Sequence, residues 1–136
     1  MRVKDWEAAL AAELRRHAGM PFGYGESDCF LVCADAVKAI TGIDPYPDAR
    51  RYRTETGAAK ALRQHGFTTI VDAWAAKFRE INRLSAMRGD ICIVDGRGAW
   101  HGPAGAIWNG REAFTKGPDG NVLLALDEVR QVFRVE

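Results

Sequence analysis

The fold is decided by the stretch Pro21-Phe-Gly-Tyr-Gly-Glu-Ser-Asp-Cys29, which joins a glycine-rich loop to a long apolar run. The pattern predicts a helix over about 28–41, and because it is apolar on most sides we expect it in the centre of the core. Asp28, or the serine before it, can cap this helix by accepting a hydrogen bond from a free amide of the first turn. Gly42 suits the left-handed residue that follows a helix. Cys29 is therefore expected at the start of a buried helix.

The rest of the chain predicts further helices followed by strands. One helix is expected between Val3 and the stop signal at Gly19. Other helices are expected at 54–65 and 71–76, and strands at 91–94, 104–108, 112–115, 122–126 and 131–135. Turn signals at Asn109-Gly110 and Pro118-Asp119-Gly120 separate the strands. Helices first and a strand meander last indicate an α+β fold, with residues 1–136 forming one domain.

Composition and charge exclude several classes of function. The 136 residues carry 19 basic and 18 acidic side chains, so no strong field attracts nucleic acid or an anionic membrane. No apolar run approaches the ~20 residues that span a bilayer, and the N-terminus lacks the apolar core and cleavage site of a signal peptide. Three cysteines form no disulfide framework, and their spacing matches no zinc site. We therefore expect no metal, no cofactor, no nucleic acid and no membrane span.

Cys29 is the strongest candidate for chemistry. Free amides and the helix dipole at the first turn favour a thiolate, which lowers the pKa of a cysteine and makes it a nucleophile. Gly23 and Gly25 allow a close approach of backbone to substrate, and the amide of Cys29 can donate to an oxyanion. The alternative is a buried core cysteine, which is how we interpret Cys33 and Cys92.

A cysteine nucleophile needs a base, and the chain has three histidines. His17 and His65 both end predicted helices, where a cation is stabilised, so each has a structural explanation. His101 follows the glycine-rich segment 96–100 and precedes a strand. At that edge of the sheet it can face a helix N-terminus. The alternative is a loop histidine with no specific role.

Three blocks of the sequence resemble the NlpC-type cell-wall peptidases. They are Pro21 to Cys29, Gly89 to Val94 and Ala104 to Gly110, in the same order and with similar spacing. The chain is more closely similar to NlpC-like proteins encoded among bacteriophage and prophage tail genes, through Thr41-Gly42 and Gly117-Pro-Asp-Gly120. The resemblance implies a papain-like fold in which N-terminal helices, with the nucleophile at the N-terminus of the central one, pack on a C-terminal antiparallel meander sheet.

The resemblance also implies roles for individual residues. Aligning the glycines of the third block puts Pro103 where the family has its histidine. His101 lies two residues earlier, and residues two apart in a strand share a face. The implied site comprises Cys29, His101 and Thr115 as nucleophile, base and orienting residue, with Tyr24 and Asp28 at the oxyanion or substrate.

Three functions follow from these observations. The first is a phage tail-tip cysteine peptidase that cuts peptidoglycan stem peptides, located in the virion or in the bacterial cytoplasm before assembly. The second is a catalytically degenerate component that binds tail hub or tip proteins. For this function Trp100 and Trp108 suit an interface, and the alternative explanation for both is core packing. The third is another thiol chemistry, such as acyl transfer or amide cleavage on a small molecule.

Overall fold

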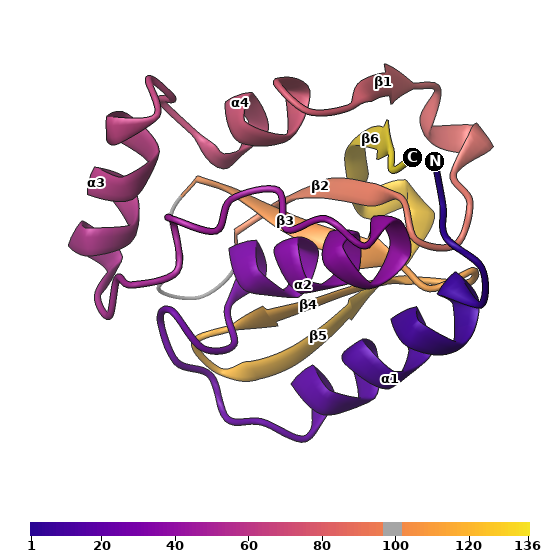
Figure 1. Cartoon of the computed structure of the whole chain (residues 1–136), viewed down its shortest axis with the longest axis horizontal. Coiled ribbons are helices and arrows are strands. Elements are labelled where there is room, and N and C mark those ends of the chain that lie inside the picture. The colour runs from indigo at the N-terminus through magenta and orange to yellow at the C-terminus, as the bar shows by residue number, and fades with distance from the viewer. Residues whose placement is uncertain (97–101) are drawn as a thin grey trace.

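Over residues 1–96 and 102–136, which the structure describes, the computed structural model has four α-helices and one six-stranded antiparallel sheet (Figure 1). The predicted α+β class is therefore confirmed. The elements are α1 (Trp6–Ala18), α2 (Cys29–Thr41), α3 (Glu55–Gln64), α4 (Ile70–Ala75), β1 (Arg79–Ile81), the 3-10 helix η1 (Arg83–Ser85), β2 (Ile91–Asp95), β3 (Pro103–Trp108), β4 (Ala113–Gly117), β5 (Gly120–Leu124), the 3-10 helix η2 (Leu126–Glu128) and β6 (Val129–Arg134).

The sheet is only partly a meander. Its strand order is β1-β6-β2-β3-β4-β5, so β2 to β5 follow the chain but β6 returns to pair with β2. The expected C-terminal meander is thus wrong for the last strand. Both edges of β2 carry backbone groups that need hydrogen-bond partners once the strand is buried. β3 pairs with one edge and β6 with the other. The sequence did not predict β1, because it has three residues with a single apolar side chain.

The helix that carries Cys29 occupies the centre of the molecule. In Figure 1, α2 lies in front of β3 and β4 with α1 alongside it. The structure has α2 in contact with all three of these elements. The predicted caps are confirmed: the Asp28 side chain caps the N-terminus, and Gly42 follows the C-terminus with φ of 79°. Cys33 and Cys92 are fully buried, as expected for core cysteines. Cys29 therefore sits at a fixed point of the core.

The first helix starts later than its apolar pattern suggests. Val3 was expected on its face, yet α1 begins at Trp6 because Asp5 adopts a left-handed conformation with φ of 60°. Val3 instead donates its amide to the carbonyl of Ile40, over 2.8 Å, at the end of α2. The two ends of the chain lie side by side (Figure 1), joined by the bond from Arg2 Nε to the Val135 carbonyl.

Gly89 and Asp90, which precede β2, connect the sheet to both ends of the chain. The carboxylate of Asp90 is fully buried and forms ion pairs with Arg2 at 3.0 Å and with Arg134 at 3.1 Å. Gly89 has φ of 93°, a left-handed conformation that strains a residue with a side chain, and a Cβ there would also lie 2.8 Å from Ile40 Cδ1. These two residues thus tie both chain termini to the sheet.

Candidate thiol site

Cys29 lines a cavity of about 260 Å³ at the N-terminal end of α2. Tyr24 and Asp28 line the same cavity, so the structure brings three of the expected site residues together. The remaining walls come from Phe30, from segment 46–52, from the inner side of α3, from residues 65–73 and from Gly102 and Pro103. A concave, largely apolar site with a few polar groups is the usual form of a ligand site.

Asp28 fixes the start of the helix that carries the thiol. Its Oδ1 accepts the amides of Phe30 and Leu31 at 3.0 and 2.8 Å. Its Oδ2 accepts the amide of Gly25 at 3.0 Å and the hydroxyl of Tyr52 at 2.6 Å. Both carboxylate oxygens thus have partners within the protein. Asp28 therefore links the loop at Gly25, the first turn of α2 and the cavity wall at Tyr52.

The thiol of Cys29 is only 2% exposed and its pKa is not lowered. Burial raises the pKa of Cys29 well above its ordinary value, and the charge of Asp28 adds to that rise. The backbone amides of Gly105 and of Cys29 itself oppose it by donating toward the sulfur. The expected depression of this pKa by the helix N-terminus is therefore outweighed by burial, which disfavours the charged form.

The strand opposite the thiol approaches it through a glycine and a proline. A Cβ at Gly105 would lie 3.1 Å from the carbonyl oxygen of Cys29, so this face of β3 touches α2. Pro103, two residues earlier on the same face, lines the cavity. The position where the resemblance has a histidine thus faces the thiol cavity and carries Pro103. His101 and Trp100 lie outside the described residues.

Thr115 lies on the other face of the sheet from Cys29. Ile107 pairs with Phe114, and paired residues share a face, so alternation turns Thr115 away from α2. Its hydroxyl donates to the carbonyl of Gly105 at 2.6 Å. Thr115 lines a second, smaller cavity of about 30 Å³ rather than the cavity of Cys29. The structure therefore does not bring the expected orienting residue to the thiol.

Tyr24 lies near the thiol, in the loop before α2. Burial raises the pKa of its phenol, and the charges of Glu55 and Asp28 raise it further. Its ring packs edge-on against Phe22, with centroids 4.9 Å apart. Tyr24 is thus held at the cavity with its phenol protonated at neutral pH.

His65 and the wall around it were not expected at the site. His65 follows α3 and lines the cavity, stacked on Phe67 and 3.2 Å from a carboxylate oxygen of Asp48. Its ring meets Tyr46 edge-on, with centroids 5.3 Å apart. The sequence feature that could have indicated this wall is the alanine-rich composition of α3. The structure shows that α3 buries none of its side chains.

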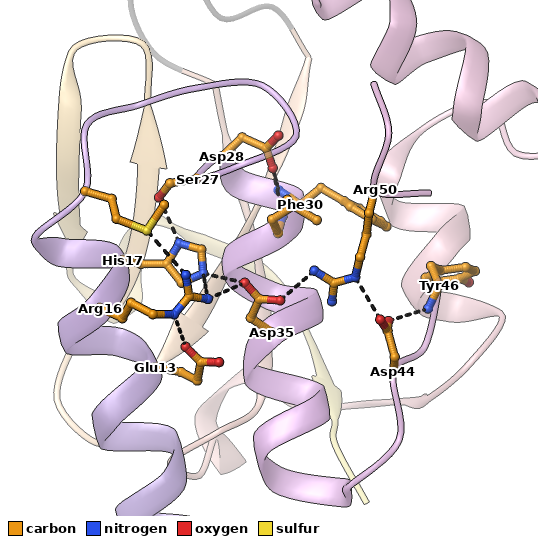
Figure 2. Close-up of polar contacts among 12 residues, drawn as sticks. Glu13, Arg16, His17, Ser27, Asp28, Phe30, Asp35, Asp44, Tyr46 and Arg50 are labelled. Atoms are coloured by element: carbon orange, nitrogen blue, oxygen red, sulfur yellow. Dashed lines mark hydrogen bonds and ion pairs between the residues drawn. The ribbon is translucent and has the colours of Figure 1, made fainter. Parts of the chain in front are cut away.

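A buried polar network supports the loop before the thiol (Figure 2). His17 lies 2.8 Å from Ser27 through Nδ1 and 2.8 Å from Asp35 through Nε2. Arg16 and Arg50 donate to the two carboxylate oxygens of Asp35 at 2.8 and 2.7 Å. The residue types match a hydrolase triad, yet Ser27 and His17 are both fully buried and line neither cavity. The network joins α1 and α2 instead.

Within residues 1–96 and 102–136, no group of three His, Cys, Asp or Glu side chains is arranged to hold a metal ion. No helix in the same residues has the length and apolar character needed to cross a membrane.

Residues 1–135 match a family described as a domain of unknown function, DUF6950. No curated protein matches the chain. The match spans the helices, the sheet and the thiol cavity together.

Proposed function

The chain belongs to the DUF6950 family, and we propose that it is a cysteine hydrolase that cleaves amide bonds in peptides. One observation carries this proposal: Cys29 stands at the N-terminus of a central helix and lines a cavity of about 260 Å³. Most buried cysteines pack against core side chains, as Cys33 and Cys92 do. A thiol that borders a ligand-sized cavity is placed to react with what enters it.

The proposed reaction begins with removal of the thiol proton. Since burial and Asp28 favour the neutral thiol, a base must accept the proton, and we assign that role to His101. The sulfur then attacks the substrate carbonyl carbon, and the amide of Cys29 donates to the oxyanion. The C–S bond forms as the C–N bond breaks, the amine leaves with the proton from the base, and water hydrolyses the thioester.

The substrate proposed from the resemblance is a peptidoglycan stem peptide, cut during cell-wall penetration by a phage tail tip. The test is incubation of the purified protein with purified peptidoglycan and identification of released peptides by mass spectrometry. We expect release by the wild type and loss in Cys29→Ser and in His101→Ala. Full activity in His101→Ala would show that the base is another residue.

A second candidate function is a non-catalytic component of a phage tail hub or tip. Two observations favour it: the raised pKa of the Cys29 thiol, and the presence of Pro103 in the cavity wall at the position where the resembled family has its histidine. Such a protein would use the cavity to grip a peptide segment of a tail protein or of the cell wall. A monomer that binds no tail protein and cleaves peptidoglycan would exclude this function.

A further inference from the structure

Much of the wall of the thiol cavity is apolar. Glu55, Ala58, Ala59 and Leu62 are spaced i, i+3, i+4 and i+7, so they form one stripe of α3, and this stripe lines the cavity. The helix buries none of its side chains. A ligand that fills the cavity would remove Ala58, Ala59 and Leu62 from water, together with the apolar groups of Phe30, Ile70 and Pro103.

The charges at this cavity are negative. Asp28 and Glu55 are carboxylates, and no described residue that lines the cavity is Lys or Arg. The two basic residues within α3, Lys60 and Arg63, are exposed and do not line it. The charge of Glu55 also acts on Tyr24, because it is the largest cause besides burial that raises the pKa of that phenol.

The histidine of the cavity does not reverse this balance. His65 lies 3.2 Å from a carboxylate oxygen of Asp48, so its ring has an acidic partner close by. Its ring is stacked on Phe67 and presents an aromatic surface. A substrate carboxylate in the cavity would therefore lose its water and meet carboxylates, which is unfavourable.

The size of the cavity bounds the group that enters. An apolar protein cavity of about 150 Å³ is known to hold benzene, so the present volume of about 260 Å³ accommodates a larger side chain or a short alkyl chain. Cys29 lies at its border, so the carbonyl carbon attacked by sulfur would belong to this same group.

We propose that the cavity is an acyl subsite that selects substrates whose acyl group is bulky, apolar and free of negative charge. The inference rests on the proposed role of Cys29 as nucleophile. It narrows the substrate class to bonds that follow a neutral apolar acyl group, and it disfavours an acyl residue that carries a carboxylate close to the reacting carbonyl.

The test measures acylation of Cys29 in the full chain by p-nitrophenyl esters of acetate, butyrate, pentanoate and hexanoate. The thioester bond forms as the ester C–O bond breaks, p-nitrophenolate leaves with the electron pair, and the thiol proton passes to the base. Mono-p-nitrophenyl glutarate is the matched probe, because it has the carbon number of pentanoate and a terminal carboxylate. The adduct is followed by intact-protein mass spectrometry, with Cys29→Ala as the background.

We expect the second-order rate constant to rise about threefold to fourfold per added CH₂, the factor that corresponds to burial of one methylene. We also expect pentanoate to react at least about tenfold faster than glutarate, since a buried unpaired charge costs at least that much. In Glu55→Gln the pentanoate-to-glutarate ratio should fall several-fold. Ala58→Leu fills the cavity and should flatten the chain-length series. Ala8→Leu, the same change at an exposed position of α1, should keep it.

Two failures have different meanings. A flat chain-length series with glutarate as fast as pentanoate, while Cys29 is still acylated, would overturn the apolar subsite and leave the nucleophile standing. Absence of any adduct with all the esters, or adducts that persist in Cys29→Ala, would overturn the proposed function itself.

Discussion

Gly105 lies so close to Cys29 that a Cβ atom on it would stand 3.1 Å from the cysteine carbonyl oxygen. The same atom would lie 2.9 Å from Cys33 Sγ, one turn further along α2. Both neighbours belong to a buried helix that cannot shift freely. The distance between the sheet and the thiol is thus set by the absence of a side chain at one position of β3.

Gly105→Ala is therefore expected to destabilise the protein by about 1–3 kcal/mol, the usual cost of overpacking a core. The measurement is urea unfolding at neutral pH. Gly117→Ala is the matched control, because a Cβ there would meet its nearest neighbour, Val122 Cγ2, at 3.9 Å, an ordinary contact. Equal stability of the two variants would contradict the close packing of β3 on α2.

The buried network around Asp35 predicts a dependence of stability on pH. Burial alone would raise the pKa of Asp35, but hydrogen bonds and charges from His17 and Arg50 outweigh it and lower that pKa from 3.8 to about 2. A lowered carboxyl pKa in the folded state contributes stability above the unfolded pKa and loses it as pH falls through the folded pKa. The contribution is about 2 kcal/mol.

The difference in unfolding free energy between the wild type and Asp35→Asn should accordingly be largest above about pH 4 and shrink by about 2 kcal/mol toward pH 2. Urea unfolding across this range checks it. Glu80→Gln, at an exposed position of β1, serves as a control for general acid effects. A difference that does not change between pH 5 and pH 2 would refute the charge pairing of Asp35.

The Asp28 carboxylate is expected to hold Cys29 in its neutral form. Burial is the largest cause of the raised pKa of the Cys29 thiol, and the negative charge of Asp28 is the second largest. Asn also caps helices well, so Asp28→Asn should keep α2 while lowering the pKa of Cys29. The pH profile of alkylation by iodoacetamide, followed by mass spectrometry, should move to lower pH. Asp127→Asn in η2 should leave the profile in place, and an equal move in both variants would argue against this role.

Local patterns in the sequence were enough to predict the helix around Cys29 and its caps. Helix periodicity and capping depend on neighbours a few residues apart, so α2 and α3 lie within a residue or two of their predicted bounds. The strands β2 to β5 were predicted from equally local patterns, namely short apolar runs separated by turn residues. By contrast, the pairing of β6 with β2 joins distant segments, and no local pattern predicts it.

The candidate site was predictable on one side only. Tyr24, Asp28 and Cys29 lie close together in the sequence and share the cavity. The opposite wall comes from α3 and residues 65–73, whose approach depends on the tertiary fold. Thr115 illustrates a further limit: one step along a strand changes the face, and the register of β3 and β4 places Thr115 away from α2.

The central claim is that Cys29 is a nucleophile whose proton is removed by His101. The most direct test is the rate of acylation of Cys29 by p-nitrophenyl pentanoate at neutral pH in the wild type and in His101→Ala, read by intact-protein mass spectrometry. A general base contributes about 10²–10⁴ in rate, so we predict that His101→Ala is slower by at least about 100-fold, with its stability to urea preserved. Equal rates in the two proteins would contradict the claim.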